Sequence, residues 1–136
     1  MVSDVHSAGG TPILVTSLSR RKYDSSGKIK EDLAPQVAAT NSVAATTKTT
    51  VLHLNEESTK YLNAIGQQDA WQYNHLVDDY THLNSPGEKL FGEMVGWLLG
   101  KSDLAGKVGG FVKLNETIVK AIEGGTFILP GNATQA

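Results

Sequence analysis

The sequence predicts an α/β fold in which a parallel sheet is covered by helices. Two short apolar runs rich in β-branched residues, 11–18 and 50–54, are typical of buried strands. Helical periodicity lies between these runs and again after the second one, so the predicted order is strand, helix, strand, helix. A parallel sheet is buried on both faces and needs several strands. We therefore expect the C-terminal part of a larger α/β domain.

The composition indicates one globular domain and excludes several classes of function. The 136 residues are 40% hydrophobic and 19% charged, with a net charge of -2. Arg20-Arg21-Lys22 is the only basic triplet, which gives nucleic-acid binding little support. The apolar runs are too short to span a membrane. Without cysteine the chain forms no disulfide, and its N-terminus lacks the pattern of a signal peptide.

The first predicted element is the end of an amphipathic helix. Val2 and Val5 followed by Gly9-Gly10 suit the last two turns of a helix with a glycine stop. No helix start signal precedes them, so we expect the chain to begin inside an element. The strand at 11–18 comes next and is expected to be buried on both faces. The polar loop after it, 19–32, is long for a connection in a compact domain.

The middle of the chain is predicted to form two helices around the second strand. Segment 34–46 suits a helix with Pro35 in its first turn. Its expected inward face consists of Val37, Thr40, Val43 and Ala44. The strand at 50–54 follows, and then a helix over 56–65 that ends at Gly66. Segment 71–81 is predicted to be mostly loop.

A strong helix start follows this loop. Ser85 can cap the helix, Pro86 suits its first position, and Glu88 completes an S-x-x-E capping box. The expected apolar face consists of Leu90, Phe91, Met94, Val95 and Leu98. This helix is expected to end at Gly100. A helix over 114–123 and a short apolar run over 126–129 complete the prediction.

Asp79 and His82 are the main candidates for chemistry. In nucleophilic hydrolysis a histidine takes the proton of a serine, and a carboxylate orients that histidine. An Asp and a His three residues apart in one turn can meet without help from another element. Active sites of open α/β sheets lie in loops that feed helices, as this turn does. The alternative is a solvated turn without chemistry, because D-x-x-H is a common pattern.

The other histidines offer a competing interpretation. His75, Asp78 or Asp79, and His82 would lie on one face if this segment were helical, as a possible metal site. The loop character of the segment argues against that site. His53 lies in the second apolar run and is expected to be a buried or edge histidine.

Several further residues could contact a ligand near this turn. Arg20 and Arg21 end the first strand, and a guanidinium suits carboxylate binding, although a solvated loop charge is an equal alternative. Aromatic side chains could stack on a sugar or simply pack: Trp71, Tyr73 and Tyr80. Two sequons make Asn115 and Asn132 candidate glycosylation sites.

A resemblance extends well beyond D-x-x-H. The stretches AGGTPILVTSLSRRKYDSSGKI, LHLNEESTKYLNAIG and DDYTHLNSPGEKLFGEMV resemble, in order and spacing, the C-terminal half of rhamnogalacturonan acetylesterases. These enzymes belong to the SGNH, or GDSL, hydrolase superfamily. The resemblance covers about residues 2–99. It rests chiefly on the S-R-R loop and the D-x-x-H-L-N turn.

The resemblance implies a fold and an activity. Residues 1–100 would be the C-terminal part of an SGNH hydrolase-type esterase domain, a flavodoxin-like three-layer α/β/α sandwich with a parallel sheet, and 101–136 would be a C-terminal extension. The enzyme would be extracellular and would remove O-acetyl groups from pectic polysaccharide or its oligosaccharides, with no metal or organic cofactor. Neither nucleic acid nor membrane would be a partner. His82 would act as the base and Asp79 would hold its imidazole.

The sequence also departs from this family. The G-D-S block with the nucleophilic serine is missing, and so are the glycine and the G-x-N-D block of the oxyanion hole. Ser7, Ser17 and Ser19 do not stand in a comparable context. We therefore expect the N-terminal strands of the domain to be missing and the chain alone to be inactive through the triad. The alternatives are a non-catalytic carbohydrate-binding fragment or a truncated remnant.

Overall fold

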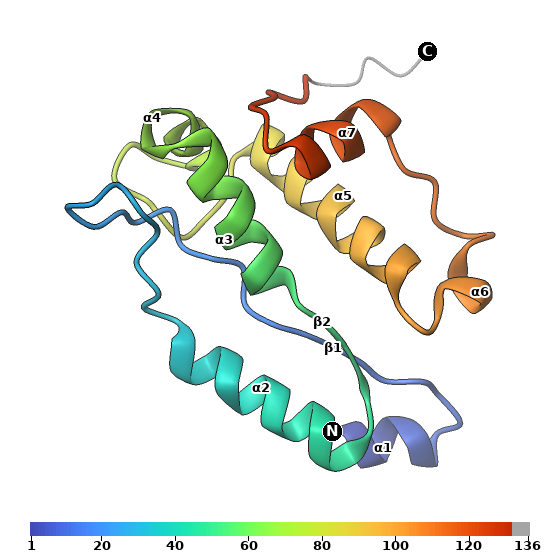
Figure 1. The fold of residues 1–136 in the computed structure, drawn as a ribbon. Helices are drawn as coiled ribbons and strands as arrows, with labels where there is room; N and C mark the ends of the chain where they lie inside the picture. The colour runs from blue at the N-terminus through green and yellow to red at the C-terminus, as the bar shows by residue number, and fades with distance from the viewer. Residues whose placement is uncertain (132–136) are drawn as a thin grey trace.

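The computed structural model describes residues 1–131 and has a mixed α/β architecture. In chain order the elements are α1 (Val2–Ser7), β1 (Ile13–Val15), α2 (Ala34–Thr47), β2 (Thr50–Leu52), α3 (Leu54–Ile65), α4 (Gln67–Ala70), the 3-10 helix η1 (Trp71–Tyr73), α5 (Ser85–Lys101), α6 (Ala105–Val108) and α7 (Glu116–Gly124). Figure 1 shows the strands between α2 on one side and α3, α5 and α7 on the other. The predicted α/β class and the order strand, helix, strand, helix are confirmed.

The sheet consists of two parallel strands. Ile13 lies opposite Thr50, and Val15 lies opposite Leu52. Helix α2 makes the crossover between the strands and packs against both of them, while α5 contacts β2 (Figure 1). This βαβ unit brings the ends of both strands to the same edge, from which the chain continues toward the candidate site.

The predicted burial of the first strand is wrong. Ile13 and Leu14 are only partly buried, and Val15 is 42% exposed. The physical reason is that β1 has one strand neighbour among the described residues, so one of its edges is uncovered. His53 was expected inside the second strand, but it is exposed and lies at the N-cap of α3, because the helix begins at Leu54.

Two helix predictions need correction in detail. On α2, Val37, Thr40 and Ala44 face inward as expected, but Val43 is 46% exposed. On α5, the N-cap is Asn84 and not Ser85, since the Asn84 side chain accepts a hydrogen bond from the backbone N–H of Gly87. Ser85 is the first helical residue instead.

The hydrophobic core lies between α3, α5 and α7. Its members include Tyr61, Leu62, Tyr73, Leu90, Phe91, Met94 and Trp97. Ile118 and Ile122 of α7 join the same cluster, so part of the chain beyond residue 100 completes this core. This packing anchors α5, whose N-terminal end follows directly on the turn that contains Asp79 and His82.

None of the helices within residues 1–131 has the length and apolarity needed to cross a membrane.

Candidate active site

The loop between η1 and α5 is closed at its base by backbone hydrogen bonds. Asn74 and Leu83 form an antiparallel bridge, and the His75 N–H donates to the His82 carbonyl at 3.1 Å. The Asn84 N–H donates to the Tyr73 carbonyl at 3.1 Å. Residues 75–82 therefore leave and return to one point of the fold, next to the start of α5.

Asp79 organises the tip of this loop through both carboxylate oxygens. Oδ1 accepts hydrogen bonds from the backbone N–H groups of Thr81 at 3.0 Å and His82 at 2.9 Å. Oδ2 lies 2.8 Å from Nδ1 of the His82 imidazole. The His82 backbone N–H contributes most to a pKa of about 2 for the Asp79 carboxyl. Asp79 is therefore a carboxylate throughout the range in which a histidine titrates.

His82 presents its imidazole to solvent while Asp79 holds one ring nitrogen. The His82 side chain is 77% exposed. When Nδ1 donates its proton to Asp79, Nε2 of the neutral ring is an acceptor that can take a proton from another group. The structure pairs His82 with Asp79, and not with Asp78, whose side chain is exposed at the pocket. This is the arrangement that the D-x-x-H spacing predicts.

An open pocket of about 900 Å³ surrounds this pair. It is lined by Arg20, Lys22 and the loop residues 76–82. Leu76 is 64% exposed and Val77 is 86% exposed at its wall. No serine lines the pocket, and within residues 1–131 no serine hydroxyl bonds to the His82 imidazole.

The two arginines that follow the first strand have different surroundings. Arg20 lines the pocket and lies 3.3 Å from the Asp32 carboxylate. Arg21 is 0% exposed and lies beneath the loop instead. Its Nε donates to Asn74 Oδ1 and its Nη2 donates to the His82 carbonyl, both at 2.6 Å. The predicted direct substrate contact fits Arg20, whereas the Arg21 guanidinium is enclosed by protein.

The three aromatic candidates for sugar stacking also differ in their exposure. Tyr73 is fully buried in the core, where its hydroxyl bonds to Tyr61, so sugar stacking by Tyr73 is wrong. Trp71 is 39% exposed and its ring centroid lies 5.5 Å from that of Tyr80. Together with Lys22 they border a smaller pocket beside the main one. Stacking on a sugar by Trp71 or Tyr80 stays a prediction.

A buried polar cluster links the end of β1 to α3, and sequence reasoning missed it. Thr16 Oγ1 accepts from the Asn55 N–H at 2.9 Å, and the Ser19 N–H donates to Ser58 Oγ at 3.1 Å. Ser19 is 3% exposed and its hydroxyl donates to the Asn55 carbonyl. The cluster fixes the course of the chain toward Arg21, and burial makes Ser19 unsuitable as a nucleophile.

The metal alternative has no geometric basis in the part of the chain that the structure describes. Segment 74–83 is a loop, so the helical spacing of His75, Asp78 or Asp79, and His82 does not apply. No group of three His, Asp or Glu side chains within residues 1–131 has an arrangement suited to a metal ion.

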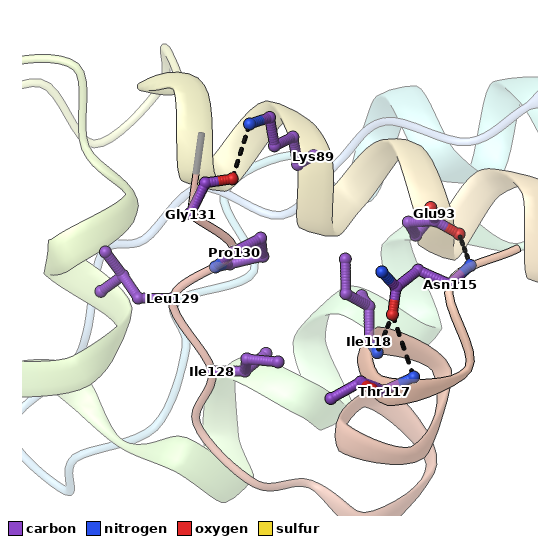
Figure 2. A pocket seen from close by; sticks show the side chains of 9 residues that line it. All are labelled: Lys89, Glu93, Asn115, Thr117, Ile118, Ile128, Leu129, Pro130 and Gly131. Carbon is purple, nitrogen blue, oxygen red and sulfur yellow. Dashed lines mark hydrogen bonds between the residues drawn. The ribbon is translucent and has the colours of Figure 1, made fainter. Parts of the chain in front are cut away.

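A second pocket, shown in Figure 2, lies between α5, α7 and the C-terminal segment. Its polar groups are engaged in structure: Lys89 Nζ donates to the Gly131 carbonyl at 2.7 Å, and Glu93 accepts from the Asn115 N–H at 3.1 Å. The side chain of Asn115 caps α7 by accepting from two backbone N–H groups (Figure 2). Asn115 is exposed, as its sequon requires, and Asn132 lies outside the described residues.

Known proteins give no family assignment for this chain. No protein-family model matches it, and neither does any curated protein or any solved structure. Any functional assignment therefore depends on the Asp79–His82 pair and the pocket around it.

Proposed function

We propose that this chain provides the acid and base of a carbohydrate esterase of the SGNH hydrolase type, which removes O-acetyl groups from pectic polysaccharide. The observation that supports this best is the Asp79–His82 pair: a carboxylate 2.8 Å from Nδ1 of an imidazole that is otherwise exposed to an open pocket. A solvated surface histidine without a chemical role would need neither this contact nor the two backbone hydrogen bonds that fix Asp79.

The roles of the two residues follow from their protonation. His82 Nε2 takes the proton of a serine hydroxyl as that oxygen attacks the acetyl carbonyl, and the resulting imidazolium then protonates the leaving sugar oxygen. Asp79 stays ionised, so it holds the ring in the productive tautomer and stabilises the imidazolium by its negative charge. Water attacks the acetyl-serine in the second half of the reaction, with His82 again as base.

The nucleophilic serine must come from a polypeptide segment other than residues 1–131. The pocket contains no serine, and Ser19 is buried in a polar cluster. The small sheet is consistent with such a segment, because parallel sheets are normally covered on both sides and β1 leaves Val15 42% exposed. In this proposal the two strands are part of a three-layer α/β/α sandwich, and the further strands of that sandwich would supply the oxyanion hole.

The test uses the protein purified from its source. Its intact mass after deglycosylation, its labelling by a fluorophosphonate serine probe and its release of acetate from acetylated pectic oligosaccharide are measured together. We expect a mass above the 14.5 kDa of this chain, one labelled serine, and acetate release. A protein of 14.5 kDa that neither labels nor releases acetate would refute the proposal.

Variants separate the two aspartates of the loop. In the serine-protease triad, exchanging the aspartate for asparagine lowers kcat by about 10⁴. We expect Asp79→Asn and His82→Ala to lower the rate of acetate release by about 10³ or more. Asp78→Asn is the matched control and should leave the rate within a few-fold. Equal effects of Asp78→Asn and Asp79→Asn would contradict the assignment.

Carbohydrate binding without hydrolysis is a second candidate function. It is favoured by the half-exposed Trp71–Tyr80 pair, which lies beside Lys22 at the rim of the main pocket. Stacking of a sugar face on such a pair, with a cation near its edge, would bind an acidic oligosaccharide. Calorimetric titration with pectic oligosaccharide would then show saturable binding by this chain alone and no acetate. Aggregation of the chain on expression would instead favour a remnant.

A further inference from the structure

We propose that Arg21 is a positioning residue, whose buried guanidinium holds the turn of Asp79 and His82 in the shape that the dyad needs. The role in catalysis rests on the function proposed above, but the structural effect on Asp79 can be measured without any activity. Arg21 lies beneath the pocket floor and touches the loop from below, so it acts through other residues and not on the substrate.

Four hydrogen bonds join Arg21 to this region. Its backbone N–H donates to the Tyr80 carbonyl at 3.0 Å, and its carbonyl accepts from Trp71 Nε1 at 3.0 Å. The guanidinium donates to Asn74 Oδ1 and to the His82 carbonyl, both at 2.6 Å. The loop is thus held at its base and at both residues that flank Thr81. The planar fork of the guanidinium lets one side chain bind Asn74 and the His82 carbonyl, on the two strands of the loop base, at the same time.

Burying the Arg21 charge costs free energy of folding, so a contribution to stability does not by itself explain why an arginine occupies this position. Arg21 is 0% exposed, and its Nη1 has no hydrogen-bond partner among the described residues. Desolvation lowers the pKa of Arg21 to about 10, so the group remains charged at neutral pH. Apolar side chains of similar volume often stabilise a fold as well as or better than a buried charge does. The function of the guanidinium is therefore to hold the backbone of the turn.

The geometry of the turn determines the charge of Asp79. The largest cause of the low Asp79 pKa is the His82 backbone N–H, and that N–H belongs to the residue whose carbonyl Arg21 binds. Without Arg21 this carbonyl keeps, within residues 1–131, only its hydrogen bond from the His75 N–H, so the N–H groups of Thr81 and His82 are held less firmly in their direction toward Oδ1. The carboxyl of Asp79 then returns toward its ordinary pKa, and the imidazole loses its orienting partner.

Other charged groups near the turn must be controlled for. The charge of Asp79 acts on Arg21 and raises the pKa of its guanidinium. Tyr23 also lies near Arg21, but burial raises the pKa of its phenol and keeps it neutral, so it contributes no charge at neutral pH. Five further charged or titratable groups share the pocket with Asp79: Arg20, Lys22, Asp78, Tyr80 and His82. Arg20 is the suitable control, because it carries the same charge on the neighbouring residue and makes no hydrogen bond to the loop in the described chain.

The experiment is a carboxyl ¹³C NMR titration of this chain, with Asp79 assigned through Asp79→Asn. At pH 4 a group with the Asp79 pKa of about 2 is ionised to about 99%, whereas one with the ordinary pKa of about 3.9 is ionised to roughly half. We expect Arg21→Met to lower the ionised fraction of Asp79 at pH 4 from nearly complete toward about half. Arg20→Met should leave it fully ionised.

Two further variants keep the test decisive. Asn74→Ala removes one of the bonds that orient the guanidinium and retains the charge, so it should raise the Asp79 pKa by a smaller amount even if Arg21→Met does not fold. Arg21→Lys retains the charge without the fork and should behave like Arg21→Met. The lowered pKa of Glu123, whose carboxylate bonds to Trp97 far from the turn, reports that the fold is intact.

A folded Arg21→Met variant whose Asp79 remains fully ionised at pH 4 would overturn the proposal. So would an Arg21→Lys variant that keeps the low Asp79 pKa, because the charge alone would then suffice. Neither result depends on acetate release, so the two proposals can fail independently. If the esterase proposal is wrong, no acetate is released, but the Asp79 titrations of the variants still differ as described.

Discussion

The N-cap of α5 allows a sharp test, because sequence and structure assign it to adjacent residues. Asn84 has extended backbone angles, φ -86° and ψ 175°, and its Oδ1 accepts from the Gly87 N–H at 3.0 Å. Its Nδ2 donates to the Gln72 carbonyl at 2.7 Å. Ser85, which the S-x-x-E pattern predicts as the cap, is exposed and already helical. The two alanine variants should therefore differ strongly.

The expected cost of Asn84→Ala follows from the two bonds that it removes. Loss of an asparagine N-cap costs about 1 kcal/mol. The bond to Gln72 adds roughly 0.5 to 1 kcal/mol, and no more, because water can replace the lost donor at this exposed position. The total is about 1.5 to 2 kcal/mol. Ser85→Ala should change stability by less than about 0.5 kcal/mol, since alanine is the better helix former.

The assay is reversible urea unfolding followed by tryptophan fluorescence. With a slope of about 1 to 3 kcal/mol per molar urea, Asn84→Ala should lower the midpoint by roughly 0.5 to 2 M without changing the slope. Asn84→Asp, which keeps the cap oxygen and loses the donor, should fall between the wild type and Asn84→Ala. If Ser85→Ala cost as much as Asn84→Ala, a Ser85–Glu88 capping box would exist in solution and the reasoning would be refuted.

Two further predictions use contrasts within the same helix bundle. A Cβ at Gly87 would lie 3.0 Å from the Tyr73 carbonyl oxygen, whereas one at Gly92 would meet nothing within 4 Å. In thermal unfolding, Gly87→Ala should therefore destabilise the protein by about 1 to 3 kcal/mol, and Gly92→Ala should stabilise it by about 0.5 to 1 kcal/mol. Stability changes of the same sign in both variants would argue against this packing. Trp97→Phe should raise the pKa of Glu123, because the indole N–H is the main cause of its lowered value. A carboxyl whose pKa is lower in the folded than in the unfolded state stabilises the fold above its unfolded pKa, and this stabilisation is lost as the pH falls through its folded pKa. The variant should therefore lose less stability than the wild type on acidification. An unchanged Glu123 titration would contradict the assignment.

The candidate dyad could be predicted from sequence because its two members are neighbours in the chain. Three residues in a polar turn bring Asp79 and His82 together through local bonds, so D-x-x-H contains most of the information. Arg21 could not be placed in the same way. Its partners Asn74 and His82 lie 53 and 61 residues away, and only the folded chain shows that the guanidinium points down into the protein while Arg20 points to the pocket.

Patterns of hydrophobic residues also leave the surroundings of an element undetermined. The run at 11–18 indicates a strand, but it cannot say how many strands lie beside it, and Val15 is consequently exposed where burial was expected. The cap of α5 shifts by one residue for a related reason. Asn84 is favoured over Ser85 because its amide also reaches Gln72, which is a contact outside the helix and outside the capping pattern.

The distance along the chain between Arg21 and its partners has a consequence for the order of folding. Closing a segment of 53 to 61 residues costs roughly 3 to 4 kcal/mol of chain entropy before any contact compensates for it. The turn at Asp79 closes only three residues, for which the same relation gives a much smaller cost, about 1 kcal/mol. We therefore expect the dyad to be assembled early in outline and to reach its final geometry late, when the segment after β1 docks under the loop. Contacts that form after the folding transition state slow unfolding more than they speed folding. The contacts of Arg21 should therefore prolong the lifetime of the assembled turn.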